Sequence, residues 1–190
     1  MKRSLLLTVA LAFLALGVAG WAVQSYTFES SSKIWVEGTS SVHDWECQVA
    51  QFAGAVDAEA GENGLAKLSG TTLAVPVRGI DCDNGTMNGK LRDALGSTPI
   101  RYTLTSATLG APAAEGWITI RTTGQLTIAG TTRPAQMEVK GKAIDGNRFR
   151  FTGQHALKMT DFGVDPPTAL LGTLKTGDQV TVHFDATVSR

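Results

Sequence analysis

Hydrophobic and polar residues alternate with a period of two along most of the chain. Eight runs show the alternation: 33–38, 45–49, 69–77, 101–105, 118–128, 136–143, 148–157 and 179–188. Successive side chains of a strand point to opposite faces, so each run predicts a strand with one apolar and one solvated face. Half-buried strands of this kind are typical of antiparallel sheets.

Turn residues separate these runs. Asp145-Gly146 lies between two alternating runs and predicts a two-residue hairpin loop, and Ala129-Gly130-Thr131-Thr132 separates two more runs. Short turns between consecutive strands favour hairpins over long crossovers.

Two segments are expected to be helical. Met87, Leu91 and Leu95 are spaced at i, i+4 and i+8, and Gly96 follows as a stop signal. A second short helix is predicted at 168–174, after Pro166-Pro167.

Eight amphipathic strands in one domain must bury their apolar faces against each other, either in a sandwich or in a barrel. The later runs are long and joined by tight turns, which favours an up-and-down barrel. The fold class predicted is therefore all-β: an antiparallel barrel of about eight strands with one or two short helices. A barrel of this size either packs shut or holds one small ligand.

The first 22 residues have the pattern of a secretory signal peptide. Lys2 and Arg3 precede an apolar stretch from Leu5 to Val18, whose 14 residues are too few to span a bilayer, which needs about 20. We expect residues 1–22 to be removed and 23–190 to form the barrel domain in the periplasm or outside the cell, with no stable membrane insertion after cleavage. An uncleaved anchor is the alternative.

Export bears on the two cysteines, Cys47 and Cys82, which are the only ones in the chain. An oxidising compartment favours a disulfide between them, and two separate thiols are the alternative. Further ligands at metal-site spacing do not accompany them, so no metal is expected.

Composition and motifs exclude several function classes. The chain has 17 basic and 17 acidic residues, which argues against a nucleic-acid binder that needs a basic surplus. Neither the Gly-x-Ser-x-Gly nor the His-Glu-x-x-His pattern occurs. The motifs thus give little indication of a catalytic site, and no cofactor is expected.

The apolar faces predict the interior of the barrel, where large aromatic residues alternate with small ones. The candidate lining residues are Leu104, Ile118, Ile120, Leu126, Met137, Val139, Phe149, Phe151, His155, Val182, Phe184 and Ala186. One interpretation is a core packed shut, with His155 satisfied by a hydrogen bond; the other is a cavity for an elongated apolar molecule, with His155 contacting its head group. Alternation alone does not decide between them.

Four segments have the character of family motifs: 124–134 (GQLTIAGTTRP), 159–164 (MTDFGV), 176–182 (TGDQVTV) and 91–95 (LRDAL) with the strand 98–106 that follows it. Together they resemble the motifs of the YceI-like family of exported lipid-binding β-barrels. Their order and spacing carry the resemblance, which extends over most of 24–190. The sequence departs from the family at Ser31-Ser32, where a His-Ser pair is usual, and within Lys90–Leu95, where the helix motif is rearranged.

The resemblance implies a lipocalin-like antiparallel barrel with an interior tunnel for a long-chain isoprenoid or fatty amphiphile and no catalytic activity. The function expected from it is a carrier or scavenger, and a packed structural or interaction barrel without a lipid is the alternative. A homodimer is left open by the sequence.

The residues that follow the apolar stretch predict where the exported protein begins. Small residues at Gly20 and Ala22, or at Val18 and Gly20, follow the short apolar stretch, so the exported protein is expected to begin at Val23 or Trp21. N-terminal sequencing of protein recovered from its own compartment measures this. A chain that starts at Met1 would contradict the prediction.

Overall fold

The computed structural model describes residues 22–61, 64–169 and 174–190. The predicted signal peptide lies outside these residues except for Ala22. Most of the described chain is strand, as the alternation predicts.

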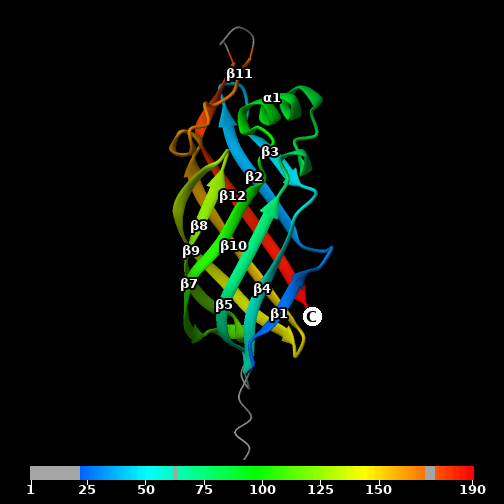
Figure 1. Cartoon of the computed structure of the whole chain (residues 1–190), viewed down its shortest axis with the longest axis vertical. Coiled ribbons are helices and arrows are strands. Elements are labelled where there is room, and N and C mark those ends of the chain that lie inside the picture. The colour runs from blue at the N-terminus through cyan, green and yellow to red at the C-terminus, as the bar shows by residue number, and fades with distance from the viewer. Residues whose placement is uncertain (1–21, 62–63, 170–173) are drawn as a thin grey trace, which may run out of the picture.

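Eight antiparallel strands form a closed ring (Figure 1). In order around the ring they are β1 (Gln24–Phe28), β4 (Ala53–Gly61), β5 (Gly64–Val75), β7 (Ile100–Pro112), β8 (Ile118–Ile128), β9 (Thr131–Asp145), β10 (Arg148–Lys158) and β12 (Leu174–Ser189). The ring closes where Thr27 and Phe28 of β1 pair with Ser189 and Val188 of β12. The predicted antiparallel barrel is confirmed.

Three further strands continue the sheet from β12 along one side of the barrel. They are β2 (Lys33–Ser40), β3 (Trp45–Val49) and β6 (Ile80–Asp81). Since β1 and β2 both pair antiparallel with β12, they run in the same direction and form one strand interrupted at Glu29–Ser32. At the break the Ser32 hydroxyl donates to the carbonyl of Thr187 at 2.9 Å and accepts from its N–H at 3.1 Å, so a side chain supplies the missing ladder bonds.

On either side of the break, the two parts of this strand pair with different neighbours. Below it, β1 pairs with β4 and closes the ring; above it, β2 pairs with β3, which in turn pairs with β6. The upper part of the wall therefore ends at β6, and the chain fills this side with a helix.

The helix α1 (Gly85–Leu95) lies over the upper end of the barrel, between β6 and β7 in sequence (Figure 1). Asn84 caps it by accepting a hydrogen bond from the N–H of Met87 at 3.0 Å, and Gly96, at a φ of 70°, ends it. This confirms the first predicted helix. Short 3₁₀ turns lie at Val77–Gly79, Ala114–Gly116 and Met159–Phe162.

The second predicted helix is wrong in the part that the structure describes. Thr168–Ala169 form a short strand, β11, in which Thr168 pairs with Lys175 at the start of β12. Pro166-Pro167 favours an extended backbone, and Thr168 is a β-branched residue that fits a strand. The remaining predicted residues, 170–173, lie outside the described chain.

Two details of the strands also differ from expectation. The β9–β10 hairpin turns at Gly146-Asn147, one residue later than predicted, because Asp145 still pairs with Arg148. The alternation did not reveal β1 or β4; β4 is rich in alanine and glycine, which gives no apolar periodicity.

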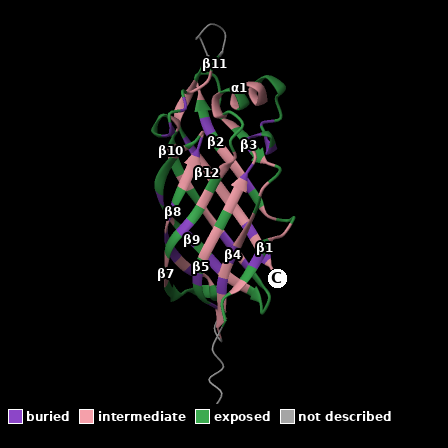
Figure 2. Ribbon diagram, viewed as in Figure 1, coloured by how far each residue is buried: buried purple, intermediate pink, exposed green. Residues whose placement is uncertain are grey.

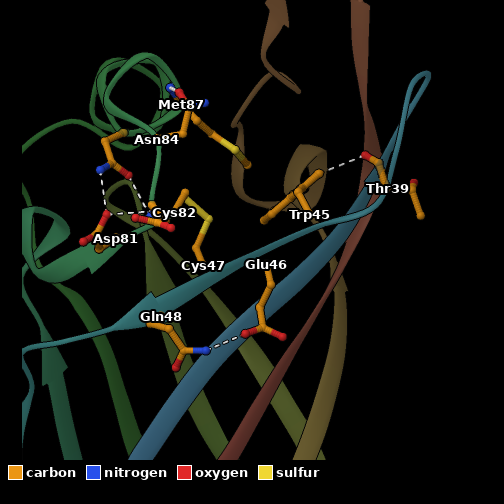
Figure 3. The surroundings of a disulfide bond; sticks show 11 residues. Thr39, Trp45, Glu46, Cys47, Gln48, Asp81, Cys82, Asn84 and Met87 are labelled. Atoms are coloured by element: carbon orange, nitrogen blue, oxygen red, sulfur yellow. Dashed lines mark hydrogen bonds between the residues drawn. A yellow bond between two sulfur atoms is a disulfide. The ribbon is translucent and has the colours of Figure 1, made fainter.

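A disulfide joins Cys47 of β3 to Cys82, which directly follows β6 (Figure 3). The pairs Gln48–Asp81 and Val49–Ile80 precede it on the same two strands, so the two cysteines face each other across the next rung. Both are buried in a cluster against which Met87, Leu91 and Leu95 of α1 pack. The bridge thus fastens the segment that leads into the helix to the edge of the sheet.

Removal of this bridge tests its contribution to stability. A closed loop with a sequence separation of 35 residues is expected to contribute about 3–4 kcal/mol in the chain-entropy description. The double variant Cys47→Ala/Cys82→Ala should lose this amount of unfolding free energy, as measured by denaturant titration. The reduced parent should show the same loss, while reductant should not affect the variant. Equal stability of the oxidised and reduced parent would exclude a stabilising role.

Candidate functional site

A cavity of about 580 Å³ occupies the upper part of the barrel and extends beneath α1. This volume falls in the range of small-molecule binding sites, about 300–1,000 Å³. Side chains from the ring strands, from β2 and β3, and from one face of α1 line it, and most of them are apolar.

The burial of the inward residues changes along β10. Phe149 and Phe151 are 0% and 6% exposed, whereas His155 and Leu157, on the same face farther up the strand, are only half-buried. The residues that line the cavity on this strand run from Phe151 to Leu157, which spans about 20 Å at the rise of a strand. The helix α1, whose residues line the cavity from above, has no buried residue and shows only the intermediate and exposed colours in Figure 2. An inward apolar side chain that is half-buried faces empty space, so the lumen is elongated and open.

The lower end of the barrel is closed. Tyr26 packs its ring edge against Phe149 with centroids 5.0 Å apart, and Ile120 and Val188 are fully buried beside them. This cluster forms a solid apolar floor. The cavity therefore ends blindly at this cluster.

Aromatic rings of the wall lie over glycines on neighbouring strands. Phe184 faces Gly153 and Phe151 faces Gly141 as direct cross-strand partners. A Cβ atom at Gly153 would lie 2.7 Å from the Phe184 ring, and one at Gly141 would lie 3.0 Å from Phe151. Because no side chain stands at these glycines, the rings lie close against the backbone.

Tyr102 on β7, Thr122 on β8 and His155 on β10 are polar side chains that line the cavity. The hydroxyl of Tyr102 is buried and has no hydrogen-bond partner among the described residues, while Thr122 donates its own hydroxyl to the carbonyl of Met137 at 3.1 Å. Burial raises the pKa of the Tyr102 phenol and lowers the pKa of the His155 imidazole. Both groups are therefore neutral near pH 7 and can form hydrogen bonds within the cavity.

The structure divides the residues predicted to line the interior into two groups. Nine of them line the cavity: Leu104, Leu126, Met137, Val139, Phe151, His155, Val182, Phe184 and Ala186. The other three, Ile118, Ile120 and Phe149, belong to the buried cluster of the floor. All twelve face inward, but alternation identifies the face of a strand and not the depth along the barrel.

The sequence reasoning missed the mouth of the cavity. His43 lies in the turn between β2 and β3, Lys90 on α1 and Lys175 at the start of β12, and all three line the cavity. The sequence contained an indication only for Lys90. This lysine directly precedes Leu91 in the predicted helix, so it lies next to the apolar face of that helix.

Residues 22–61, 64–169 and 174–190 meet the requirements of neither a metal site nor a membrane-spanning helix. No three His, Cys, Asp or Glu side chains there are grouped so that they could hold a metal ion. No helix in these ranges combines the length and apolar character needed to cross a membrane.

The family described as the YceI-like domain matches residues 24–188. The protein belongs to this family. Its barrel also resembles several solved structures, and no curated protein matches the sequence.

Three of these structures illustrate how far the fold is shared. BcnA of Burkholderia cenocepacia is 19% identical with a TM-score of 0.63, over 82% of this chain and 95% of that one. A polyisoprenoid-binding domain from Saccharophagus degradans is 11% identical with a TM-score of 0.65, over 88% and 99%. The Campylobacter jejuni YceI protein is 15% identical with a TM-score of 0.58, over 76% and 84%. At these identities the likeness establishes the fold of this YceI-like protein.

The position of His155 predicts a pH-dependent stability. Because burial lowers its pKa in the folded state, the unfolded chain binds the proton more readily below about pH 6.5. The free energy of unfolding should therefore decrease as the pH is lowered from about 7.5 to about 5.5, and His155→Leu should flatten this dependence. Denaturant titrations across this range measure it. His43→Asn, in an exposed turn, is the control and should keep the parent's dependence of unfolding free energy on pH. If His155→Leu keeps it as well, His155 is not its source.

Proposed function

We propose that this YceI-like protein is an exported, non-catalytic binding protein that holds a long-chain isoprenoid or fatty amphiphile in its barrel. The observation that carries the proposal is the elongated apolar cavity of about 580 Å³ with a closed floor. A core packed shut, the alternative from the sequence, would leave no such space. The likeness to the S. degradans polyisoprenoid-binding domain supports the same class of ligand.

Apolar burial is the driving force for binding. Each methylene removed from water contributes about 0.8 kcal/mol, so about ten methylenes supply about 8 kcal/mol before ordering costs. Micromolar affinity is therefore within reach of the hydrocarbon chain alone. A chain inserts with its end toward Tyr26 and Phe149 and leaves its polar group nearer α1, where Lys90 and Lys175 line the cavity.

Export is part of the proposal. The signal-peptide pattern of residues 1–22 and the disulfide between Cys47 and Cys82 both suit an oxidising compartment. A water-soluble barrel there would carry or scavenge lipid between membranes. The absence of any catalytic motif in the sequence supports a role in binding.

A pair of tryptophan variants on one strand tests whether the lumen is the site. Met137 is half-buried and lines the cavity, while its neighbour Gln136 is exposed on the outer face of β9. Met137→Trp should place its ring in the space that a lipid occupies and lower the affinity for a fluorescent long-chain probe about tenfold or more. The free energy of unfolding without ligand should change by less than about 1 kcal/mol, because the ring enters open space.

Gln136→Trp is the matched control and should leave both quantities unchanged. If the parent binds no probe and Met137→Trp loses about 1–3 kcal/mol by overpacking, the lumen is filled and the proposal is wrong. Native mass spectrometry of protein purified from its own host gives an independent test. A retained lipid is the expected result, and repeatedly empty preparations favour the packed structural barrel.

A further inference from the structure

Two lysines at the mouth of the cavity converge on one residue. The Lys90 ammonium on α1 donates a hydrogen bond to the backbone carbonyl of Thr168 at 2.6 Å. Lys175 is the direct cross-strand partner of Thr168 in the β11–β12 pair, so their side chains project from the same side of that pair. The helix and the start of the last ring strand therefore bring two positive charges to the same part of the mouth.

Neither charge is neutralised within the described part of the chain. The salt bridges there join Lys67 to Glu59, Arg148 to Asp145, Arg150 to Asp185 and His183 to Glu37. The bond to Thr168 uses only one of the three protons of the Lys90 ammonium. Lys175 is exposed to solvent.

The cavity lining carries no opposing charge. Although the chain has as many acidic as basic residues, no Asp or Glu occurs among the described residues that line the cavity. Its ionisable side chains are the two lysines, His43, His155 and Tyr102. An apolar tube whose charged positions are all cationic, and all at its entrance, is complementary to a molecule with an apolar chain and an anionic end.

We infer that the head group of the ligand is anionic, a carboxylate or a phosphate, and that Lys90 and Lys175 bind it at the mouth while the chain fills the lumen. This inference rests on the proposed function and adds the chemical class of the head group to it. Oxygen anions accept charge-assisted hydrogen bonds from ammonium groups, and a neutral alcohol of the same chain length does not gain this attraction.

A competition series that changes only the head group tests the inference. Dodecanoate, dodecyl phosphate and dodecanol displace a neutral fluorescent long-chain probe from the parent protein, the two anions below their critical micelle concentrations and dodecanol below its solubility limit. We expect one or both anions to bind about five- to tenfold more tightly than dodecanol, the range expected for two solvated ion pairs. Raising the salt concentration from about 0.05 M to about 0.5 M should reduce this preference and leave dodecanol binding unchanged.

The variant Lys90→Gln/Lys175→Gln should bring the preference for the anions to within about twofold of unity, with dodecanol affinity unchanged. Glutamine at position 90 keeps an N–H that can donate to Thr168, so the helix retains this tie without the charge. Lys140→Gln is the matched control, because it removes one positive charge from an exposed residue that does not line the cavity. This control should keep the full preference.

The outcomes separate the head-group inference from the proposed function. If all three compounds bind the parent equally well, the inference is wrong and the lipid-binding function stands. If none displaces the probe and the probe itself does not bind, the proposed function fails and the inference fails with it. If the double lysine variant loses dodecanol binding as well, the lysines support the fold of the mouth and do not recognise an anion. Preference for dodecanoate or for dodecyl phosphate identifies which anion the mouth selects.

Discussion

The close approach of aromatic rings to glycines on adjacent strands keeps the barrel hollow. Phe184 lies against Gly153 and Phe151 against Gly141, at distances that a Cβ atom on either glycine would make too short. Tyr102 lies over Gly124 in the same way. Each ring occupies the space that a side chain at the glycine would take. The ring therefore lies against the wall and does not project into the lumen. The cavity, the half-buried inward residues above the floor and the open mouth all depend on this arrangement.

The two ends of the barrel are built by different means. The lower end is closed by continuous strand pairing, since β1 joins β4 to β12, and by the buried cluster around Tyr26 and Phe149. At the upper end the sheet diverges after the break at Glu29–Ser32, and α1 covers the gap. No residue of α1 is buried, so packing alone holds it weakly, and the disulfide supplies a covalent fastening next to its first turn.

The sequence predicted the fold well where residues alternate and poorly where they do not. The runs at 118–128, 136–143, 148–157 and 179–188 correspond to β8, β9, β10 and β12, because the apolar face of each points toward the interior of the barrel. β1 was missed because it is short, and β4 because its alanines and glycines carry no apolar pattern, although Tyr26 and Val56 from these strands close the floor.

For the candidate site, the sequence predicted which residues face inward but not which of them line the cavity. The period of two identified an inward face, which is a property of each strand by itself. Whether Ile120 packs in the floor or Met137 lines the cavity depends on the register and tilt of all eight strands, which a single run does not encode. The lysines of the mouth belong to segments distant in the chain, and only the pairing of β11 with β12 brings them together.

The cavity has a thermodynamic consequence for the protein as a whole. Part of the hydrophobic core is also the wall of the lumen: Leu104, Val139 and Phe151 belong both to the buried cluster that forms the floor and to the cavity wall. A molecule in the lumen therefore completes the packing of the folded state and has no equivalent place in the unfolded chain. A molecule that binds only the folded state raises the free energy of unfolding. Once its free concentration exceeds the dissociation constant, this increase grows with the logarithm of the concentration. The melting temperature of this protein should therefore rise with the free concentration of any molecule that binds in the lumen, even after the lumen is saturated.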